Sequence, residues 1–146
     1  MITKEYISEL KRKGNSELAN LIKNQRDIGT INFILESLGQ LPNNFDSTFL
    51  YELLNHQHSQ VRLNAVKNIG KLNGNSDIKK LSDLYKKETD TSVKREIISS
   101  IGRQRKPENK SLLFEFLEDE DPKAICQAIR GLLVFEKDKD VEEHLK

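Results

Sequence analysis

The sequence repeats itself at intervals of 31 or 32 residues, and this period limits the possible folds more than any other feature. The residues that open the four copies stand at steps of 31, 32 and 31: Asp27, His58, Asp90 and Asp121. In the second copy the apolar residues that follow are Val61, Ala65, Val66, Ile69 and Leu72. Their spacing forms one stripe of an amphipathic helix. A fixed period of this length is typical of a helical solenoid.

A second apolar stripe shares this period and precedes the first in every copy. One of its rows has steps of 32, 31 and 32 and contains Leu18, Leu50, Leu81 and Leu113. Each copy therefore predicts two helices joined by a tight turn, and Asp27, Asp90 and Asp121 are expected to cap the second helix. We expect four hairpins at about 16–41, 46–72, 77–105 and 109–135.

The two ends of the chain lie outside these four copies. Residues 3–13 predict a short helix that carries Tyr6, Ile7 and Leu10, and we expect it to cover the first hairpin. Residues 139–146 resemble the start of a fifth first helix, because Leu145 lies 32 residues after Leu113. We therefore expect a single all-α domain over residues 1–146, an α-α superhelix of four hairpins with an N-terminal capping helix, within a longer protein.

Composition places few limits on function. The formal net charge of +1 does not indicate what kind of partner the chain binds. Its one cysteine cannot form a disulfide within the chain. No apolar run approaches the ~20 residues of a membrane span. The N-terminal residues include acidic side chains and lack the apolar core of a secretory signal. We expect a cytoplasmic protein that does not bind membranes.

The repeats resemble HEAT repeats, in a short form also seen in bilin lyase-like proteins. Their core reads Leu-Leu, a turn, and then Asp-x-x-Val-Arg-x-x-Ala-x-x-x-Leu-Gly. The copy most similar to it contains Leu53-Leu54, Val61-Arg62, Ala65-Val66 and Ile69-Gly70. The fourth copy departs from the pattern, with Ile125 in place of the arginine and Leu133 in place of the glycine. The resemblance implies an α-solenoid that acts as a binding scaffold, with the second helices on the concave face.

Three features could suggest chemistry, and each has a simpler structural interpretation. His56 and His58 are two imidazoles where zinc requires three or four protein ligands, so we expect solvated turn residues. Cys126 has no histidine near it in the sequence to act as a base, so we expect a partly buried, inert thiol. The acidic run Glu118–Asp121 lacks the spaced ligands of a calcium loop. We expect no cofactor, no metal and no catalysis by this chain alone.

The distribution of charge is the most informative feature for binding. The predicted first helices carry six basic and eight acidic residues, whereas the second helices carry eight basic and two acidic residues. The candidate binding residues on the second helices are Arg62, Lys67, Lys71, Lys94, Arg95, Arg103 and Arg130. Such a basic strip suits a phosphate backbone or an acidic protein segment. The alternative is a solvated face on which the arginines bond to neighbouring turns.

These observations favour a non-catalytic scaffold whose basic concave face binds a protein or nucleic acid. If the partner is a protein, we expect Leu63 and Asn64 to be among its contacts. One alternative is a DNA-targeting module of a larger DNA-modifying enzyme such as a methyltransferase. Another is an enzyme related to bilin lyases or to HEAT-like DNA-repair enzymes. The absence of tryptophan and the presence of only three tyrosines disfavour base excision.

Overall fold

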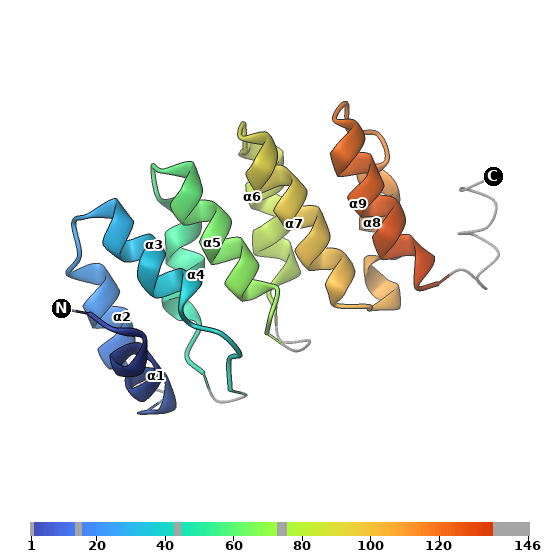
Figure 1. Ribbon diagram of the computed structural model, residues 1–146. Coiled ribbons are helices and arrows are strands. Elements are labelled where there is room, and N and C mark those ends of the chain that lie inside the picture. Colours follow the sequence, from blue (N-terminus) through green and yellow to red (C-terminus); the bar gives the residue numbers. More distant parts are fainter. Residues whose placement is uncertain (1, 14–15, 43–44, 73–75, 136–146) are drawn as a thin grey trace. The chain divides into compact units, whose positions relative to one another are not determined.

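The computed structural model describes residues 2–13, 16–42, 45–72 and 76–135, and this part of the chain is helical, with no strand (Figure 1). The chain divides into two compact units, residues 1–73 and 74–146. Each unit contains two of the four expected hairpins. The all-α prediction is confirmed, while residues 139–146, where a fifth hairpin is expected to begin, lie outside the described residues.

The first unit contains an N-terminal helix followed by two helix pairs. Its elements are α1 (Lys4–Lys13), α2 (Ser16–Lys23), α3 (Ile28–Glu36), α4 (Thr48–Glu52), the 3-10 helix η1 (Leu53–Asn55) and α5 (Ser59–Ile69). The second helices α3 and α5 pack side by side, and α5 also contacts α4 and η1 (Figure 1). Neighbouring second helices within this unit are therefore in direct contact.

The second unit repeats this arrangement with two further helix pairs. Its elements are α6 (Ile78–Lys87), α7 (Thr91–Arg103), the 3-10 helix η2 (Pro107–Asn109), α8 (Lys110–Phe116) and α9 (Pro122–Leu133). Helix α7 packs along α9, and α9 also packs on α8 (Figure 1). The pairing of second helices is thus the same as in the first unit.

The predicted caps begin three of the four second helices. The Asp27 carboxylate accepts the N–H of Thr30, Asp90 accepts that of Val93, and Asp121 accepts that of Lys123. Each bond satisfies a backbone donor that has no partner within its helix. His58 occupies the same position before α5, but its side chain makes no capping bond.

The second-helix stripes form the core, as the period predicts. Val61, Ala65 and Ile69 are each 0% exposed, and so are Ile97 and Ile98. The first copy differs by one residue, because Ile31 is buried whereas the preceding Thr30 is half-buried. The Thr30 hydroxyl donates to the Asp27 carboxylate. The hydroxyl is thereby held at the helix terminus, and the next residue takes the core position.

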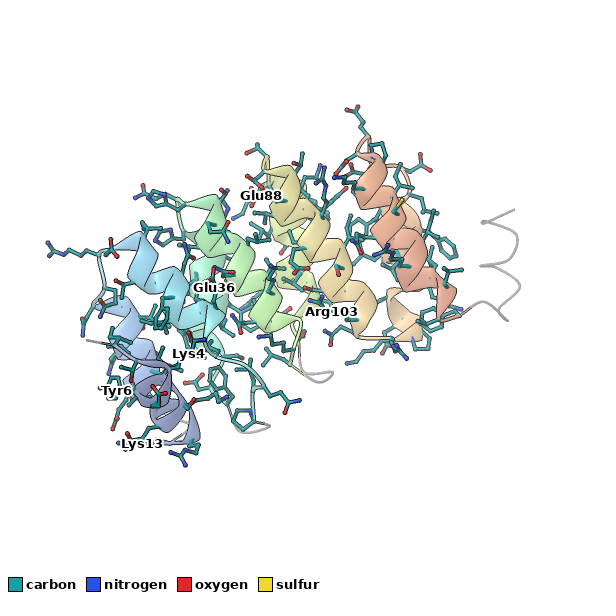
Figure 2. The ribbon with its side chains drawn as sticks, viewed as in Figure 1. Lys4, Tyr6, Lys13, Glu36, Glu88 and Arg103 are labelled. Carbon is teal, nitrogen blue, oxygen red and sulfur yellow. The ribbon has the colours of Figure 1, made fainter. Side chains whose placement is uncertain are left out.

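The N-terminal helix α1 packs on α2 through Ile7 and Leu10. Ile7 and Leu10 are buried, whereas Tyr6 is 44% exposed (Figure 2). Lys11 Nζ donates to the carbonyl oxygens of Leu38 and Gln40, just beyond α3. A lysine at this place stabilises the negative end of a helix. Helix α1 therefore contacts α2 and the segment that follows α3.

Two asparagines of α5 are buried, although the sequence predicts Asn64 as a contact for a partner. Asn64 and Asn68 are 4% and 2% exposed. Asn64 Nδ2 donates to Asn32 Oδ1, and Asn68 Nδ2 donates to the Leu35 carbonyl of α3. These bonds replace the hydrogen bonds to water that each amide loses when it is buried. The expectation that Asn64 is free for binding is therefore wrong, because its amide joins α5 to α3.

A pair of glycines sets the distance between α7 and α9. A Cβ atom on Gly131 would lie 3.1 Å from Gly102 Cα and 3.2 Å from Leu113 Cδ1. Both distances are tighter than nearly all real Cβ contacts, so the two helix backbones approach closely. The HEAT pattern expects a glycine at Leu133, which is 46% exposed. In the fourth copy the glycine that α7 needs thus stands two residues earlier.

Within the described residues, every helix is too short or too polar to span a lipid bilayer.

Candidate binding surface of the second helices

The seven candidate cations divide between the two units. The first unit contains Arg62 and Lys67 on α5, with Lys71 just after it. The second unit contains Lys94, Arg95 and Arg103 on α7, together with Arg130 on α9. Five of the seven contact other groups of their own unit, and the exceptions are Lys67 and Arg130.

Arg62 and Lys71 stabilise the first unit from within. Arg62 is half-buried, and its Nη1 donates to the His56 carbonyl in the turn before α5, at 2.8 Å. Lys71 Nζ lies 3.3 Å from the Gly39 carbonyl and 3.3 Å from Asn68 Oδ1. The carbonyl of Gly39 lies between those that Lys11 binds. Both cations therefore already satisfy backbone acceptors of their own unit.

Lys94 and Arg95 join α7 to the turn between α8 and α9. Arg95 Nε lies 2.5 Å from Asp121 Oδ2, and its Nη2 lies 3.2 Å from Asp121 Oδ1. This two-point geometry is the strong arrangement for a guanidinium and a carboxylate. Lys94 Nζ lies 3.3 Å from Asp119 Oδ2 and 4.9 Å from the centre of the Tyr85 ring. Both charges are thus paired within the second unit.

Asp119 is the centre of a network that the sequence did not reveal. Its side chain is 4% exposed, and it accepts the Tyr85 hydroxyl and the backbone N–H of Asp121 as well as facing Lys94. Burial by itself would raise the pKa of Asp119. The hydrogen bond from Tyr85, the backbone bond and the Lys94 charge outweigh it and lower the pKa. The pKa of Tyr85 is raised, by burial first and then by its bond to Asp119.

This network belongs to a repeated turn. The residue two positions before each second helix's capping position is Gln25, His56, Glu88 or Asp119, at steps of 31, 32 and 31. In the last three copies its side chain accepts the backbone N–H of His58, Asp90 and Asp121, respectively. Gln25 instead donates to the Leu21 carbonyl. An acceptor at a fixed place in the period is the sequence signal that would have identified Asp119.

Arg103 is held by three neighbours on α7. Its Nη1 lies 3.3 Å from Ser99 Oγ, its Nη2 lies 3.0 Å from Ser100 Oγ, and a Glu96 carboxylate oxygen lies 3.8 Å from Nη2. The Arg103 side chain is 48% exposed, whereas that of Glu96 is 12% exposed. Arg103 can reach a partner only with its charge already partly compensated.

Lys67 and Arg130 are the cations best placed to bind a partner. Both are exposed, and neither makes a hydrogen bond or an ion pair to any other described residue. They occupy equivalent positions, nine residues after His58 and Asp121, so each unit presents one of them at the same place on a second helix.

The cysteine, the two turn histidines and the acidic run have structural surroundings that differ in part from those expected. Cys126 is exposed, so the expectation of a partly buried thiol was wrong. His56 Nδ1 accepts the His58 N–H, which leaves Nε2 as the protonated nitrogen of the neutral ring. Among the described residues, no three histidine, cysteine, aspartate or glutamate side chains gather as a metal site would require. Of the acidic run, Asp119 and Asp121 are engaged in ion pairs rather than being surplus solvated charges.

Comparison with protein-family models and with curated proteins finds no match to this chain.

The acidic pair Asp119 and Asp121 should make the stability of the second unit depend on pH. The pKa values of Asp119 and Asp121 are lowered in the folded protein. Their stabilisation is therefore fully present above the unfolded value of about 3.9 and is lost as the pH falls through the lower folded values. We expect Asp119→Asn to lower the urea midpoint clearly at pH 7 and much less at pH 3.

The control for this experiment is Glu115→Gln, which removes an exposed carboxylate of α8. Its urea midpoint should follow that of the wild type at both pH values. A difference between Asp119→Asn and wild type that is the same at pH 7 and pH 3 would contradict the ionic role of Asp119.

Proposed function

We propose that this chain is a non-catalytic HEAT-like scaffold that binds an acidic segment of a partner protein through its second helices. The proposed architecture is one right-handed superhelix of four stacked hairpins in a cytoplasmic protein. Support comes from the shared 31- or 32-residue period and from the side-by-side packing of second helices in each unit. A solenoid of this kind presents its second helices as one continuous face.

The observation that carries the proposal is the position of Lys67 and Arg130. They are equivalent by the period, exposed, and without a partner among the described residues. Structural cations such as Arg62 and Arg95 are needed to hold turns, whereas Lys67 and Arg130 have no such contact. An exposed cation thus stands at this position on α5 and α9, with Ser99 at the equivalent position of α7. Such cations attract an acidic partner.

The small number of free cations favours a protein over duplex DNA. The logarithm of the DNA affinity falls with the logarithm of the salt concentration by about 0.9 for each neutralised phosphate. Lys67, Arg130 and the partly paired Arg103 could neutralise only a few phosphates, fewer than the 6–10 contacts of steeply salt-dependent DNA binders. An acidic peptide gains from the same charges and can add apolar and backbone contacts. The DNA-targeting module thus remains the second candidate.

The test measures fluorescence anisotropy with a labelled polyglutamate peptide and a labelled random duplex, at low and at physiological salt. We expect the peptide to bind at low salt and the variant Lys67→Glu/Arg130→Glu to lose at least about tenfold in affinity, or 1.4 kcal/mol. The matched control is Arg26→Glu/Lys86→Glu, which makes the same charge change at exposed positions outside the second helices. The control should bind like the wild type, apart from the loss that a lower net charge causes.

Two outcomes would overturn the proposal. Equal losses in both double variants would show that net charge alone, and not the second-helix face, attracts the peptide. Tighter binding of the duplex than of the peptide, with a salt slope steeper than about three, would favour the DNA-targeting module instead.

A further inference from the structure

The first unit contains a small cavity where α2, α3 and α4 meet. It has a volume of about 280 Å³. Its apolar wall consists of Ile22, Ile31, Phe49 and Leu53. The first three of these are 3%, 4% and 4% exposed, so the wall is part of the packed core and is held in place. Pockets for drug-sized ligands usually measure about 300–1,000 Å³, so a ligand of this cavity must be small.

Polar groups of both charges surround the cavity. They belong to Lys23, Gln25, Glu52 and His56. Lys23 Nζ and a Glu52 carboxylate oxygen lie 3.4 Å apart, and the two side chains are 54% and 53% exposed. The pair thus joins α2 to α4 beside the cavity. An exposed ion pair of this kind contributes little to stability, so a ligand can exchange its partners at small cost.

The existing hydrogen bonds of His56 and Gln25 determine which of their polar atoms can still bind a ligand. His56 Nδ1 accepts the His58 N–H, so the neutral ring carries its proton on Nε2 and can donate there. Burial, with the charges of His58 and Arg62, lowers the pKa of His56 and favours this neutral form. Gln25 Nε2 donates to the Leu21 carbonyl, which leaves its Oε1 as an acceptor. The cavity therefore offers a cation and an N–H donor, together with a carboxylate and an amide acceptor.

We propose that this cavity binds a free α-amino acid with an apolar side chain. The ligand carboxylate pairs with Lys23 and accepts from His56 Nε2, while the ligand ammonium pairs with Glu52 and donates to Gln25 Oε1. The side chain lies against the apolar wall. A zwitterion inserted into the Lys23–Glu52 pair keeps each protein charge next to an opposite one. A ligand with a single charge would separate that pair and leave one of its members without an opposite charge beside it.

A second, larger cavity of about 440 Å³ also includes Gln25 but does not suit such a ligand. Its carboxylate belongs to Asp27, which already accepts the N–H and the hydroxyl of Thr30. No lysine or arginine is among its lining residues. The smaller cavity is therefore the one with complementary charges.

The experiment titrates the whole chain with L-leucine while recording NMR spectra that include the His56 ring. Two leucine analogues serve as probes: 4-methylpentanoate, which lacks the amine, and 3-methylbutylamine, which lacks the carboxylate. We expect saturable binding of L-leucine in the millimolar range, with shifts at His56, and at least about tenfold weaker binding of either analogue.

The variant Glu52→Gln makes the test sharper, because it removes one charge from a half-exposed side chain without changing the apolar wall. We expect it to weaken L-leucine about tenfold and to strengthen 4-methylpentanoate, since Lys23 then has no competing partner. The matched control, Glu17→Gln, removes the carboxylate of a different exposed ion pair of the same unit, Lys13–Glu17, and should leave both affinities unchanged.

Two results would overturn the proposal. One is the absence of saturable shifts at His56 with L-leucine at any millimolar concentration. The other is equal binding of L-leucine and 4-methylpentanoate by the wild type, which would show that the cavity selects apolar bulk and not the paired charges.

Discussion

The variant Ile98→Asp should unfold the second unit at room temperature or leave it barely stable. Ile98 is 0% exposed on α7, the helix that packs along α9. Loss of a buried isoleucine side chain costs about 2–5 kcal/mol, and an unpaired buried carboxylate adds to this. The sum approaches the 5–15 kcal/mol that stabilises a whole domain. Circular dichroism during urea denaturation measures the loss.

Two control variants separate the effect of the buried charge from other effects of substitution. Ile98→Val removes one methyl group and should cost about 0.5–1.5 kcal/mol. Lys86→Ala lies on the exposed surface of α6 in the same unit and should change the midpoint little. Equal midpoints for Ile98→Asp and Lys86→Ala would contradict the burial of the α7 stripe.

The variant Gly131→Val should destabilise the second unit by about 3 kcal/mol, through crowding rather than through a cavity. Its Cβ would lie 3.1 Å from Gly102 Cα, a backbone atom that cannot move without shifting α7. The two further methyl groups of valine add volume at a site where Leu113 Cδ1 and Cδ2 already lie 3.2 Å from the Cβ position. Thermal unfolding followed by circular dichroism should show a lower midpoint.

The control for crowding is a glycine with space around it. Gly29 is exposed near the start of α3, and a Cβ there would lie 3.3 Å from Asp27 Oδ2, a side-chain atom that can adjust. Replacing a helical glycine by alanine usually stabilises by up to ~1 kcal/mol. Gly29→Ala should thus be neutral or stabilising, whereas Gly131→Ala should destabilise. A stabilising Gly131→Ala would show that α7 and α9 do not approach closely.

The helix pairs, their caps and their core could be predicted because they depend on local sequence. An apolar residue that recurs at helical spacing predicts a buried stripe whatever that stripe packs on. Leu35, Val66 and Ile98 share one row of the period, and all three are 0% exposed. Asp27, Asp90 and Asp121 cap their helices through residues only two or three positions away.

The use of the charged and amide side chains could not be predicted in the same way. Arg95 and Asp121 are 26 residues apart, and Tyr85 and Asp119 are 34 apart, in different hairpins. Their pairing depends on how one helix pair lies on the next, which a single period does not specify. Asp119 in an acidic run and Asn64 in a polar face both look solvated, although both side chains are buried.

The spacing of these inter-hairpin hydrogen bonds has a consequence for folding kinetics. The bonds from Asn64 to Asn32, Asn68 to Leu35, and Tyr85 to Asp119 join residues 32, 33 and 34 positions apart. The entropy lost in forming each of them is that of closing a loop of about thirty residues, and it does not grow as hairpins are added. Relative contact order therefore falls as such a chain lengthens, and low contact order accompanies fast folding. A protein built this way can gain a hairpin during evolution without folding more slowly.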